Sequence, residues 1–224
     1  MSDSMTTPYP MVIDGHLDES LRRFHWLVKW FLAIPHFVVL TFLWIAFAVL
    51  TVVAGISIAF NGRYPRSIFD FNVGVMRWTW RVHFYAFTFG TDQYPPFTLG
   101  ADVDYPAHLD VEYPEQLSRG LVWVKWWLLA IPQYLIVAAI NGGAGIHVGL
   151  VGVLCIVAGV ILAVTREYPP TIFRFVMGLH RWTWRVVAYA ALMRDEYPPF
   201  RLDMGPDDPG SASPPEQLTD PLAA

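Results

Sequence analysis

Charged residues are scarce in this sequence. They make up 15% of it, whereas soluble domains carry about 25%. Hydrophobic residues make up 54%, and the mean hydropathy is +0.38. Such a chain is not intrinsically disordered, because disordered chains combine low hydrophobicity with high net charge. The composition instead predicts a membrane protein.

The sequence also lacks an excess of positive charge and a second cysteine. Fifteen Lys and Arg face 19 Asp and Glu, so the formal net charge is −4 and no global basic field is available to bind nucleic acid. The single cysteine, Cys155, lies in an apolar run and cannot form an intrachain disulfide. These absences exclude a nucleic-acid-binding protein and a disulfide-rich secreted module.

Motifs of common enzymes and metal sites are missing as well. The sequence has no HExxH motif, no Cys/His pairing and no carboxylate-rich helix, so we expect no metal and no cofactor. It has no nucleophile elbow, P-loop or dinucleotide fingerprint. An enzyme is therefore disfavoured, but it stays open, since membrane-embedded enzymes need not carry these signatures.

What the sequence does contain is a tandem duplication. The segment "YPRSIFDFNVGVMRWTWRV" from Tyr64 matches "YPPTIFRFVMGLHRWTWRV" from Tyr168, and earlier in each copy Lys29 aligns with Lys125 at an offset of 96 residues. Self-similarity of this kind indicates a repeat architecture. We divide the chain into an N-terminal tail (1–8), repeat 1 (9–100), a linker (101–104), repeat 2 (105–202) and an acidic, proline-rich tail (203–224) that we expect to be disordered.

The repeated motifs resemble a known family. "YPE-x-LSR", "KW-x-LAIP", "YP-x-x-IF-x-F-x-x-G-x-x-RWTWRV" and "YPPF-x-L" are similar to those of the bacterial membrane protein family of domain of unknown function 4389. The resemblance covers nearly the whole chain, twice, although repeat 1 has "LDESLRR" where repeat 2 has "YPEQLSRG". It implies a membrane fold and no particular activity.

The apolar block of repeat 1 runs from Phe24 to Phe60. As a single helix it would be about 55 Å long, well beyond a hydrocarbon core of ~30 Å. It is therefore either a surface helix followed by one span, with a kink at Pro35, or a helical hairpin. No Gly, Pro or Asn stands near Thr41–Trp44, where the turn of a hairpin would fall.

Repeat 2 favours the hairpin. Its block contains the turn-like insertion "NGGAG" (141–145), which leaves two apolar stretches of span length. A hairpin also places the flanking Lys and Arg on one side of the membrane, as the positive-inside rule prefers. We predict an all-α, multi-pass protein of the cell membrane with a transmembrane hairpin in each repeat, four spans and both termini cytoplasmic. The alternative is one long span plus a second spanning helix in each repeat. It also gives an even number of spans, so both termini would again lie on the same side.

The "RWTWR" segments form the third element of each repeat. Both keep a polar stripe at i, i+4, i+7 and i+11, which is one face of a helix. Two arginines in one isolated span would cost roughly 5–7 kcal/mol on insertion scales. We therefore predict Arg/Trp amphipathic helices that lie in the membrane interface. The alternative is a spanning helix whose arginine stripe is buried against a bundle.

These helices supply the candidate site residues. A guanidinium group matches a phosphate in bidentate geometry, so we predict contact with anionic lipid headgroups or with a membrane partner. The candidates are Arg77, Trp78, Trp80, Arg81, Arg181, Trp182, Trp184 and Arg185. The competing interpretation is simple anchoring, or salt bridges to the acidic linker and tail.

Small residues follow one helical face in repeat 2. Gly145, Gly149, Gly152 and Gly159 would let another helix approach closely in lipid. The stripe serves either intramolecular packing or self-association as a homo-oligomer. Repeat 1 lacks it, so we expect the two copies to pack differently.

Short extended segments are predicted at the membrane surface. Residues 107–113 alternate apolar and polar side chains, which is typical of a strand, and "PPFTL" and "PPFRL" end the two copies. Prolines favour extended geometry in the residue before them, so we interpret the Tyr-Pro pairs as structural punctuation. The tyrosines concerned are Tyr9, Tyr64, Tyr94, Tyr105, Tyr113, Tyr168 and Tyr197.

Three classes of function remain open. The favoured one is a non-enzymatic accessory or scaffold protein that contacts anionic lipid or a membrane partner. A small transporter or channel component would need polar side chains inside the spans, and these are few. A membrane-embedded enzyme that acts on lipid is the third.

Overall fold

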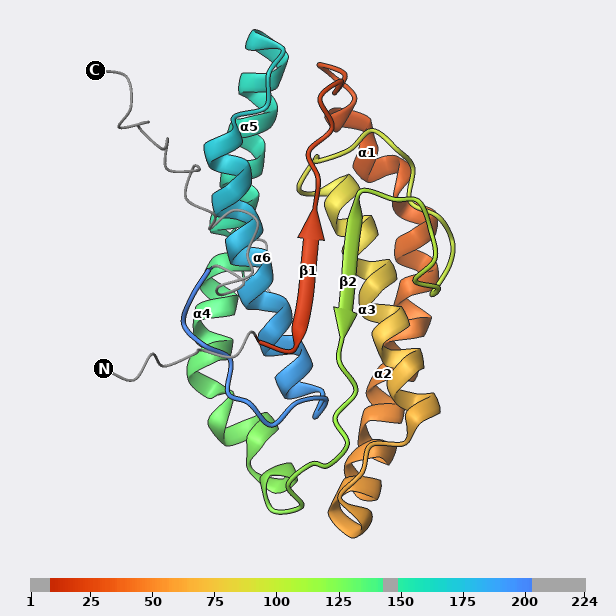
Figure 1. Cartoon of the computed structure of the whole chain (residues 1–224). Coiled ribbons are helices and arrows are strands. Elements are labelled where there is room, and N and C mark those ends of the chain that lie inside the picture. The colour runs from red at the N-terminus through yellow and green to blue at the C-terminus, as the bar shows by residue number, and fades with distance from the viewer. Residues whose placement is uncertain (1–8, 143–148, 203–224) are drawn as a thin grey trace, which may run out of the picture.

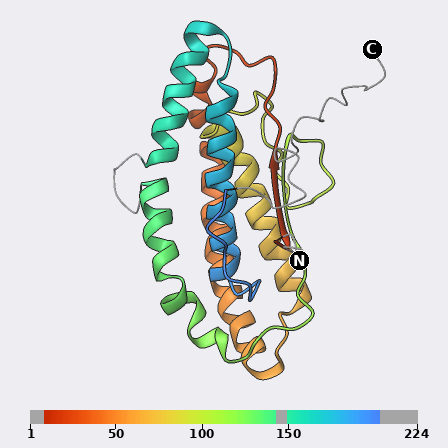
Figure 2. The same cartoon turned by 60° about the vertical axis from the view of Figure 1, so that its left-hand side comes forward.

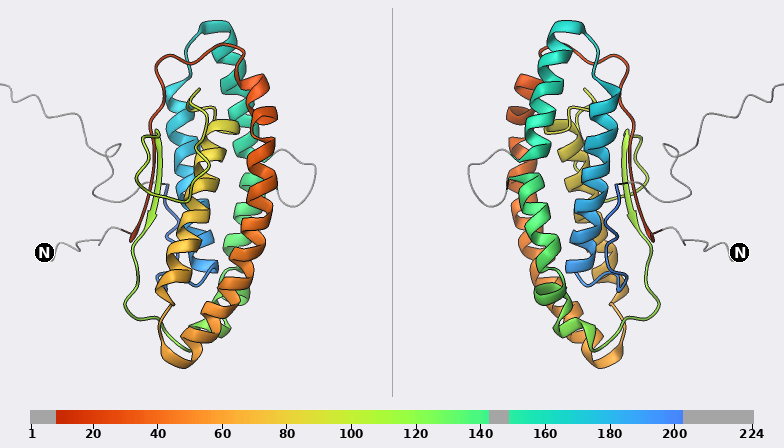
Figure 3. Two further views of the ribbon diagram at one scale, coloured as in Figure 1. Left: turned by 90° about the vertical axis from the view of Figure 1, so that its right-hand side faces the viewer. Right: turned by 90° about the vertical axis from the view of Figure 1, so that its left-hand side faces the viewer.

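The protein is built in three layers, as a computed structural model of residues 9–142 and 149–202 shows (Figures 1 and 3). A two-stranded sheet forms the first layer, α3 and α6 the second, and α1, α2, α4 and α5 the third. The elements are β1 (Met11–Gly15), α1 (Trp26–Leu32), α2 (Ile34–Asn61), α3 (Arg66–Ala86), β2 (Ala107–Val111), the short helices η1 (Leu121–Trp123) and η2 (Lys125–Leu129), α4 (Ile131–Asn141), α5 (Leu150–Thr165) and α6 (Pro170–Ala190).

The sheet lies on an approximate two-fold axis that relates the repeats. β1 and β2 pair antiparallel, and Ile13 is the partner of Leu109. The offset of 96 residues maps Ile13 onto Leu109, so the central pair consists of two equivalent residues. An antiparallel pair of this kind has its two-fold axis perpendicular to the sheet. The strand expected within 107–113 is confirmed as β2, and its counterpart β1 opens repeat 1.

A tyrosine from each repeat donates a hydrogen bond to a backbone carbonyl of the other repeat. The Tyr64 hydroxyl donates to the Ala191 carbonyl at 3.5 Å, and Tyr168, its equivalent, donates to the Thr88 carbonyl at 2.9 Å. Both tyrosines are buried. The two repeats therefore form one interdigitated body.

The hairpin prediction is wrong for repeat 1. α2 runs unbroken through Thr41–Trp44, and the Thr41 hydroxyl donates to the Phe37 carbonyl within the helix. Pro35 lies in the first turn, where its missing N–H costs nothing, and Gly62 ends the helix in the left-handed conformation. The helix continues because no Gly, Pro or Asn stands near Thr41–Trp44, where the turn of a hairpin was expected.

Repeat 2 contains no hairpin among its described residues either. α4 and α5 lie end to end and together take the place of α2 (Figure 2). A Cβ added to Gly149 would collide with the backbone at Asn141 and Gly142, so the two helix ends are adjacent. The insertion separates two collinear helices, and the four predicted hairpin spans are not found. Within the described residues, α2 alone is long and apolar enough to cross a membrane.

The "RWTWR" segments form the expected helices, α3 and α6, but the outer helices cover the apolar face that was predicted to lie in the membrane interface. Each begins directly after a Tyr-Pro pair and runs for 21 residues. They occupy the middle layer, where α3 packs between α2 and the sheet, and α6 between α4–α5 and the sheet (Figure 3). Both of their faces are thus covered by protein, because the sheet and its flanking loops shield the polar stripe.

One residue has been inserted at the start of repeat 2. Lys29 and Ala33 are four residues apart in repeat 1, whereas Lys125 and Ala130 are five apart. The amide of Ala33 accordingly donates to the Lys29 carbonyl, and the amide of Ala130 donates to the Lys125 carbonyl, as in a π-helix. The extra residue is absorbed in η2, which keeps the flanking segments in register.

Two histidines meet where α3 faces α6. The ring centroids of His83 and His180 are 4.7 Å apart, and Nε2 of His180 lies 3.1 Å from the Thr88 hydroxyl oxygen. Burial lowers the pKa of His83 to about 4. Burial, together with the charge of His83, lowers the pKa of His180 well below its ordinary value. The two rings are therefore neutral at pH 7.

We expect stability to fall as the pH drops below about 6.5, the ordinary pKa of histidine. The folded-state pKa values of His83 and His180 lie below the unfolded value, so protons bind preferentially to the unfolded chain in this range. Melting temperatures measured near pH 7.5 and pH 5 in detergent test this. The double variant His83→Gln/His180→Gln should flatten the dependence, and an unchanged dependence would contradict the assignment.

Candidate functional site

The outer helices expose a continuous apolar face. Phe42, Phe60 and Leu135 are 68%, 76% and 69% exposed, respectively. These helices lie together on one side of the molecule (Figure 3). The other exposed apolar residues on this side include Trp30, Phe31, Val38, Ile45, Val49, Val52, Ile56, Trp123, Trp126, Val153, Ile156, Val160 and Val164. Soluble monomers rarely expose a contiguous apolar surface on this scale.

The opposite side of the molecule is polar. On the outward face of the sheet, His108 is exposed and the Asp110 side chain is 73% exposed. Beyond the end of β1, the His16 side chain is 72% exposed and lies 3.1 Å from the Asp14 carboxylate. The sheet lies near the middle of the long helices rather than at one end (Figure 1). The two faces of the molecule therefore differ sharply in polarity.

Arg77 and Arg181 tie the middle layer to the sheet. The Arg77 guanidinium donates to the Leu109 carbonyl at 3.0 Å and to the Asp110 carboxylate at 2.8 Å. Arg181 donates to the Ile13 carbonyl at 3.3 Å. Since Ile13 and Leu109 form the central pair of the sheet, each arginine binds the strand of the other repeat.

Arg81 and Arg185 hold the segments that end the two repeats. Arg81 is fully buried and donates to the Gly100 carbonyl at 2.8 Å and to the Thr98 carbonyl at 3.4 Å. Arg185 is 1% exposed and donates to the Arg201 carbonyl at 2.9 Å. The "PPFTL" and "PPFRL" segments form no strand. They provide carbonyl oxygens for buried guanidinium groups.

Three of the four candidate tryptophans, Trp78, Trp80 and Trp184, are buried, and Trp182 is partly buried. The Trp78 indole donates to Nδ1 of His36 at 3.0 Å, and Trp182, its equivalent, donates to the Gln133 side chain at 2.8 Å. Trp80 donates to the Asp14 carbonyl at 3.0 Å, while Trp184 is 6% exposed. The structure brings all eight candidate Arg and Trp residues together in the middle layer. Their contact with lipid headgroups or a membrane partner stays a prediction.

The glycine stripe is only partly described. Gly145 lies outside the described residues, Gly149 precedes α5 and Gly152 lies within it. A Cβ added to Gly159 would lie 3.1 Å from the Trp26 ring, so this glycine lets α5 approach repeat 1 closely. Its neighbour in space belongs to the same chain.

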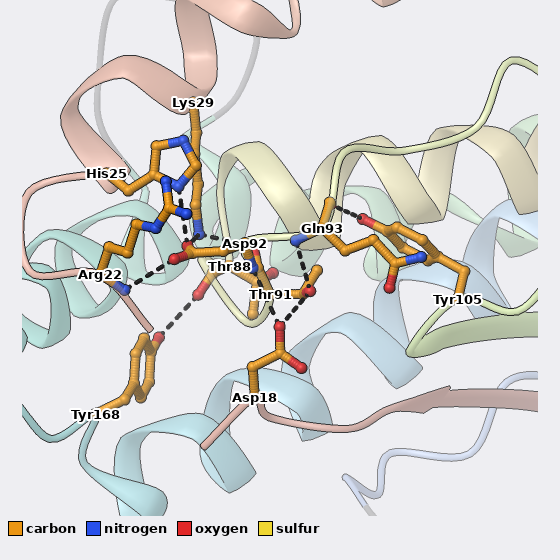
Figure 4. Close-up of polar contacts among 10 residues, drawn as sticks. All are labelled: Asp18, Arg22, His25, Lys29, Thr88, Thr91, Asp92, Gln93, Tyr105 and Tyr168. Atoms are coloured by element: carbon orange, nitrogen blue, oxygen red, sulfur yellow. Dashed lines mark hydrogen bonds and ion pairs between the residues drawn. The ribbon is translucent and has the colours of Figure 1, made fainter. Parts of the chain in front are cut away.

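A buried polar cluster lies where α1 meets the segment after α3 (Figure 4). Nζ of Lys29 lies 2.8 Å from the Asp92 carboxylate and donates to the Thr91 carbonyl at 2.7 Å. Asp92 also accepts the Arg22 amide at 2.8 Å, and its carboxylate lies 3.3 Å from Nδ1 of His25. Lys29 is 1% exposed, so this ion pair is shielded from water.

Asp18 fixes the same turn from the other side. Its carboxylate accepts the Thr91 hydroxyl at 2.5 Å and the Asp92 amide at 3.2 Å, as Figure 4 shows. The Thr91 hydroxyl in turn accepts the Gln93 amide at 3.0 Å. The backbone at 91–93 is thus held by side chains from the start of repeat 1.

Repeat 2 contains the same ion pair. Nζ of Lys125 lies 2.7 Å from the Asp195 carboxylate and donates to the Arg194 carbonyl at 2.6 Å. The Ser118 amide donates to Asp195 at 2.6 Å, as the Arg22 amide does to Asp92. Because each lysine is matched by a carboxylate and a carbonyl, the arrangement fixes the backbone of the turn in both repeats.

Charge and burial compete at these pairs. Burial lowers the pKa of Lys29, against the hydrogen bond and charge of Asp92. Burial alone would raise the pKa of Asp92, but hydrogen bonds from Lys29 and the Arg22 amide, with the charges of Lys29 and His25, hold it below its ordinary value. Lys29 lies within the apolar block from Phe24 to Phe60, and composition alone does not indicate that it forms a buried ion pair. Its exact duplication as Lys125 was the available signal.

Comparisons with known proteins give a family and nothing finer. A family model described as a domain of unknown function (DUF4389) matches residues 11–98 and 122–201, so it matches twice. No curated protein and no solved structure matches. In the described part of the chain, no group of three or more His, Cys, Asp or Glu could hold a metal ion.

Proposed function

This chain belongs to the family described as a domain of unknown function (DUF4389), and since that description states no activity, we propose a function from the geometry. The protein is a non-enzymatic accessory protein that lies in the plane of a membrane. Its outer helices, α1, α2, α4 and α5, are embedded in lipid, and its sheet faces water and is available to a partner. The observation that carries this proposal is the apolar face opposite a charged sheet.

The apolar face supports an in-plane position. An interfacial helix buries its apolar side at the boundary of headgroups and acyl chains. Here the side chains of four helices point the same way, including Phe42, Val49 and Ile56 on α2 alone. At about 25 cal/mol per Å² of apolar surface, such a face gains far more from lipid than a single amphipathic helix would.

A spanning position fits the same molecule less well. α2 has 28 residues and is about 42 Å long, so it would have to tilt strongly within a hydrocarbon core of ~30 Å. The exposed Asp110 and His108 would then face lipid near the bilayer centre. A carboxylate there costs about 2.5–3.5 kcal/mol even on insertion scales.

The two-fold axis favours the same position. It runs perpendicular to the sheet, and an in-plane protein would align it with the membrane normal. Both repeats then lie at the same depth and in the same leaflet. A spanning protein would instead hold its two repeats in inverted orientation, although their flanking basic residues are alike.

Exposed arginines at the ends of the molecule support contact with anionic headgroups. A basic residue near an anionic leaflet contributes about 1 kcal/mol, and the cytoplasmic leaflet is the anionic one. These arginines are Arg22, Arg63, Arg66, Arg119, Arg166 and Arg174. In this proposal they take the role that the sequence suggested for the buried Arg/Trp helices, and both termini are cytoplasmic.

Cysteine labelling of the two ends of α1–α2 tests the orientation. Arg22 precedes α1 and Arg63 follows α2, at opposite ends of the molecule (Figure 1). In a Cys155→Ala background, we expect Arg22→Cys and Arg63→Cys to react with an impermeant maleimide in inverted vesicles and not in spheroplasts. A spanning protein would expose one of the two in each preparation, which would overturn the proposal. Asp110→Cys is the positive control and Val49→Cys the lipid-facing one.

A further inference from the structure

Two pockets are formed between the second half of α2 and the segment that follows β2. The first is apolar, has a volume of about 340 Å³ and is lined by residues that include Gly55, Ile56, Val122, Trp126 and Leu192. The second is polar, with a volume of about 800 Å³. Its lining includes Ser57, Asn61, Arg63, Gln116 and Arg119. Each pocket has one wall from α2 (51–56 in the first, 57–61 in the second) and another from the segment after β2 (122–126 and 113–119), so the two lie along neighbouring stretches of the same two segments.

The apolar pocket exists because two large side chains are missing. At the equivalent junction, a Cβ on Gly159 would lie 3.1 Å from the Trp26 ring, and Trp26 packs on Phe89 with ring centroids 5.7 Å apart. The 96-residue offset places Val122 at the position of Trp26. A smaller residue therefore stands where the other junction is filled by an indole.

Leu192 is the second smaller residue. It has a positive φ of 62° after α6, as Phe89 has a φ of 58° after α3, so the two occupy equivalent positions. A Cβ on Gly55 would meet Leu192 at 3.1 Å and Val122 at 3.7 Å, in place of aromatic rings. One of two equivalent junctions is thus closed by aromatics, and the other is left open. The open one also contains the π-helix, a feature that often marks functional sites.

The polar pocket carries unbalanced positive charge. Arg63 and Arg119 line it together with neutral groups. Within residues 9–142 and 149–202, neither guanidinium has a hydrogen bond or an ion pair. At the other junction, Glu167 stands at the position of Arg63. The excess of positive charge and the open apolar pocket therefore occur at the same junction.

We propose that the two pockets together bind one anionic glycerophospholipid. The phosphate lies between Arg63 and Arg119, whose planar donors match its oxygens, and one acyl chain enters the apolar pocket. A volume of about 340 Å³ is within the range of ligand pockets. The inference rests on the proposed in-plane position, because the apolar pocket opens among side chains of the lipid-facing surface, such as Val52 and Trp123.

Native mass spectrometry of the full chain, released from micelles containing phosphatidylglycerol and phosphatidylcholine, tests the proposal. We expect the wild type to retain one phosphatidylglycerol. Arg63→Gln/Arg119→Gln should lower its apparent affinity at least tenfold. The matched control Arg23→Gln/Arg166→Gln makes the same change in charge at the equivalent junction, and it should leave retention unchanged. Equal loss in both variants would show only general charge attraction and would overturn the site.

The predicted acyl-chain pocket is tested by introducing into repeat 2 the aromatic residues that fill the equivalent junction. Val122→Trp/Leu192→Phe should abolish retention, and a folded variant that still binds one lipid would refute the chain site. Trp26→Val/Phe89→Leu is the size control, since it opens the other junction, where Glu167 stands at the position of Arg63, and it should gain no phosphatidylglycerol. Melting curves establish that each variant is folded.

Two further measurements distinguish a failure of the lipid site from a failure of the proposed function. Inorganic phosphate should compete with the lipid only weakly, and full competition would reassign the pocket to a free anion. All variants should float equally with vesicles of phosphatidylcholine alone, because the apolar outer face is intact in each and this lipid carries no net charge. If the wild type fails to float, the proposed function fails. If it floats without retaining a lipid, only the site fails.

Discussion

Lys29→Met is expected to lower the free energy of unfolding by about 3–5 kcal/mol, the usual effect of removing one partner of a buried ion pair. The substitution keeps the length of the apolar stem and removes the ammonium group. Asp92, whose side chain is 18% exposed, then keeps its charge without the cation that compensates it. Lys125→Met should have a similar effect, because Asp195 is 25% exposed.

The exposed pair of Arg66 and Asp70 provides the control. Their side chains lie 3.1 Å apart but are 65% and 55% exposed, so Arg66→Gln should cost less than 1 kcal/mol, in the range of about 0–1 for surface pairs. Denaturant titrations in detergent, followed by tryptophan fluorescence, give the comparison. If Lys29→Met lowers the free energy of unfolding no more than Arg66→Gln does, the buried ion pair does not stabilise the fold as we describe.

Gly74→Ala and Gly178→Ala should each destabilise the protein, by about 1–3 kcal/mol for overpacking. A Cβ on Gly74 would lie 2.8 Å from Cβ of Leu99, and one on Gly178 would lie 2.7 Å from Cβ of Leu202. Helix propensity alone would reverse the sign, because alanine is favoured over glycine within a helix by about 1 kcal/mol. A measured loss of stability would therefore show that the segment ending each repeat packs closely against the glycine.

Gly120 is the matched control for these substitutions. Nothing lies within 4 Å of a Cβ added there, and its φ of −74° suits any residue. Gly120→Ala should be close to neutral in the same denaturant titration. Stabilisation by Gly74→Ala would mean that the "YPPF" segment does not pack on α3 as closely as described.

Periodicity and duplication were sufficient to predict the helices of the middle layer. The stripe places Gly74, Arg77 and Arg81 on one helical face, and in the structure all three contact the same terminal segment. The spacing could not reveal which groups the polar stripe contacts. A polar stripe has the same sequence signature whether it faces headgroups or backbone carbonyls.

The hairpin prediction failed for a related reason. "NGGAG" has the composition of a turn, but composition does not determine whether the chain reverses afterwards or continues in the same direction. Repeat 1 contained the deciding evidence, because α2 lacks any helix-ending residue near Thr41–Trp44. The sequence also shows that Trp26 is replaced by Val122 in repeat 2. Only the packing of these residues against Gly159 and Gly55 shows that Trp26 fills a cavity and Val122 leaves it open.

The exchange of tyrosines between the repeats has a consequence for synthesis. Tyr9 leaves the ribosome long before Glu196, 187 positions later, whose carbonyl accepts the Tyr9 hydroxyl. Tyr64 similarly depends on Ala191, 127 positions later. Contacts so distant in sequence are slow to form. Repeat 1 therefore emerges before the carbonyl acceptors of Tyr9 and Tyr64 exist. These native contacts form only after repeat 2 has been translated as far as Ala191 and Glu196.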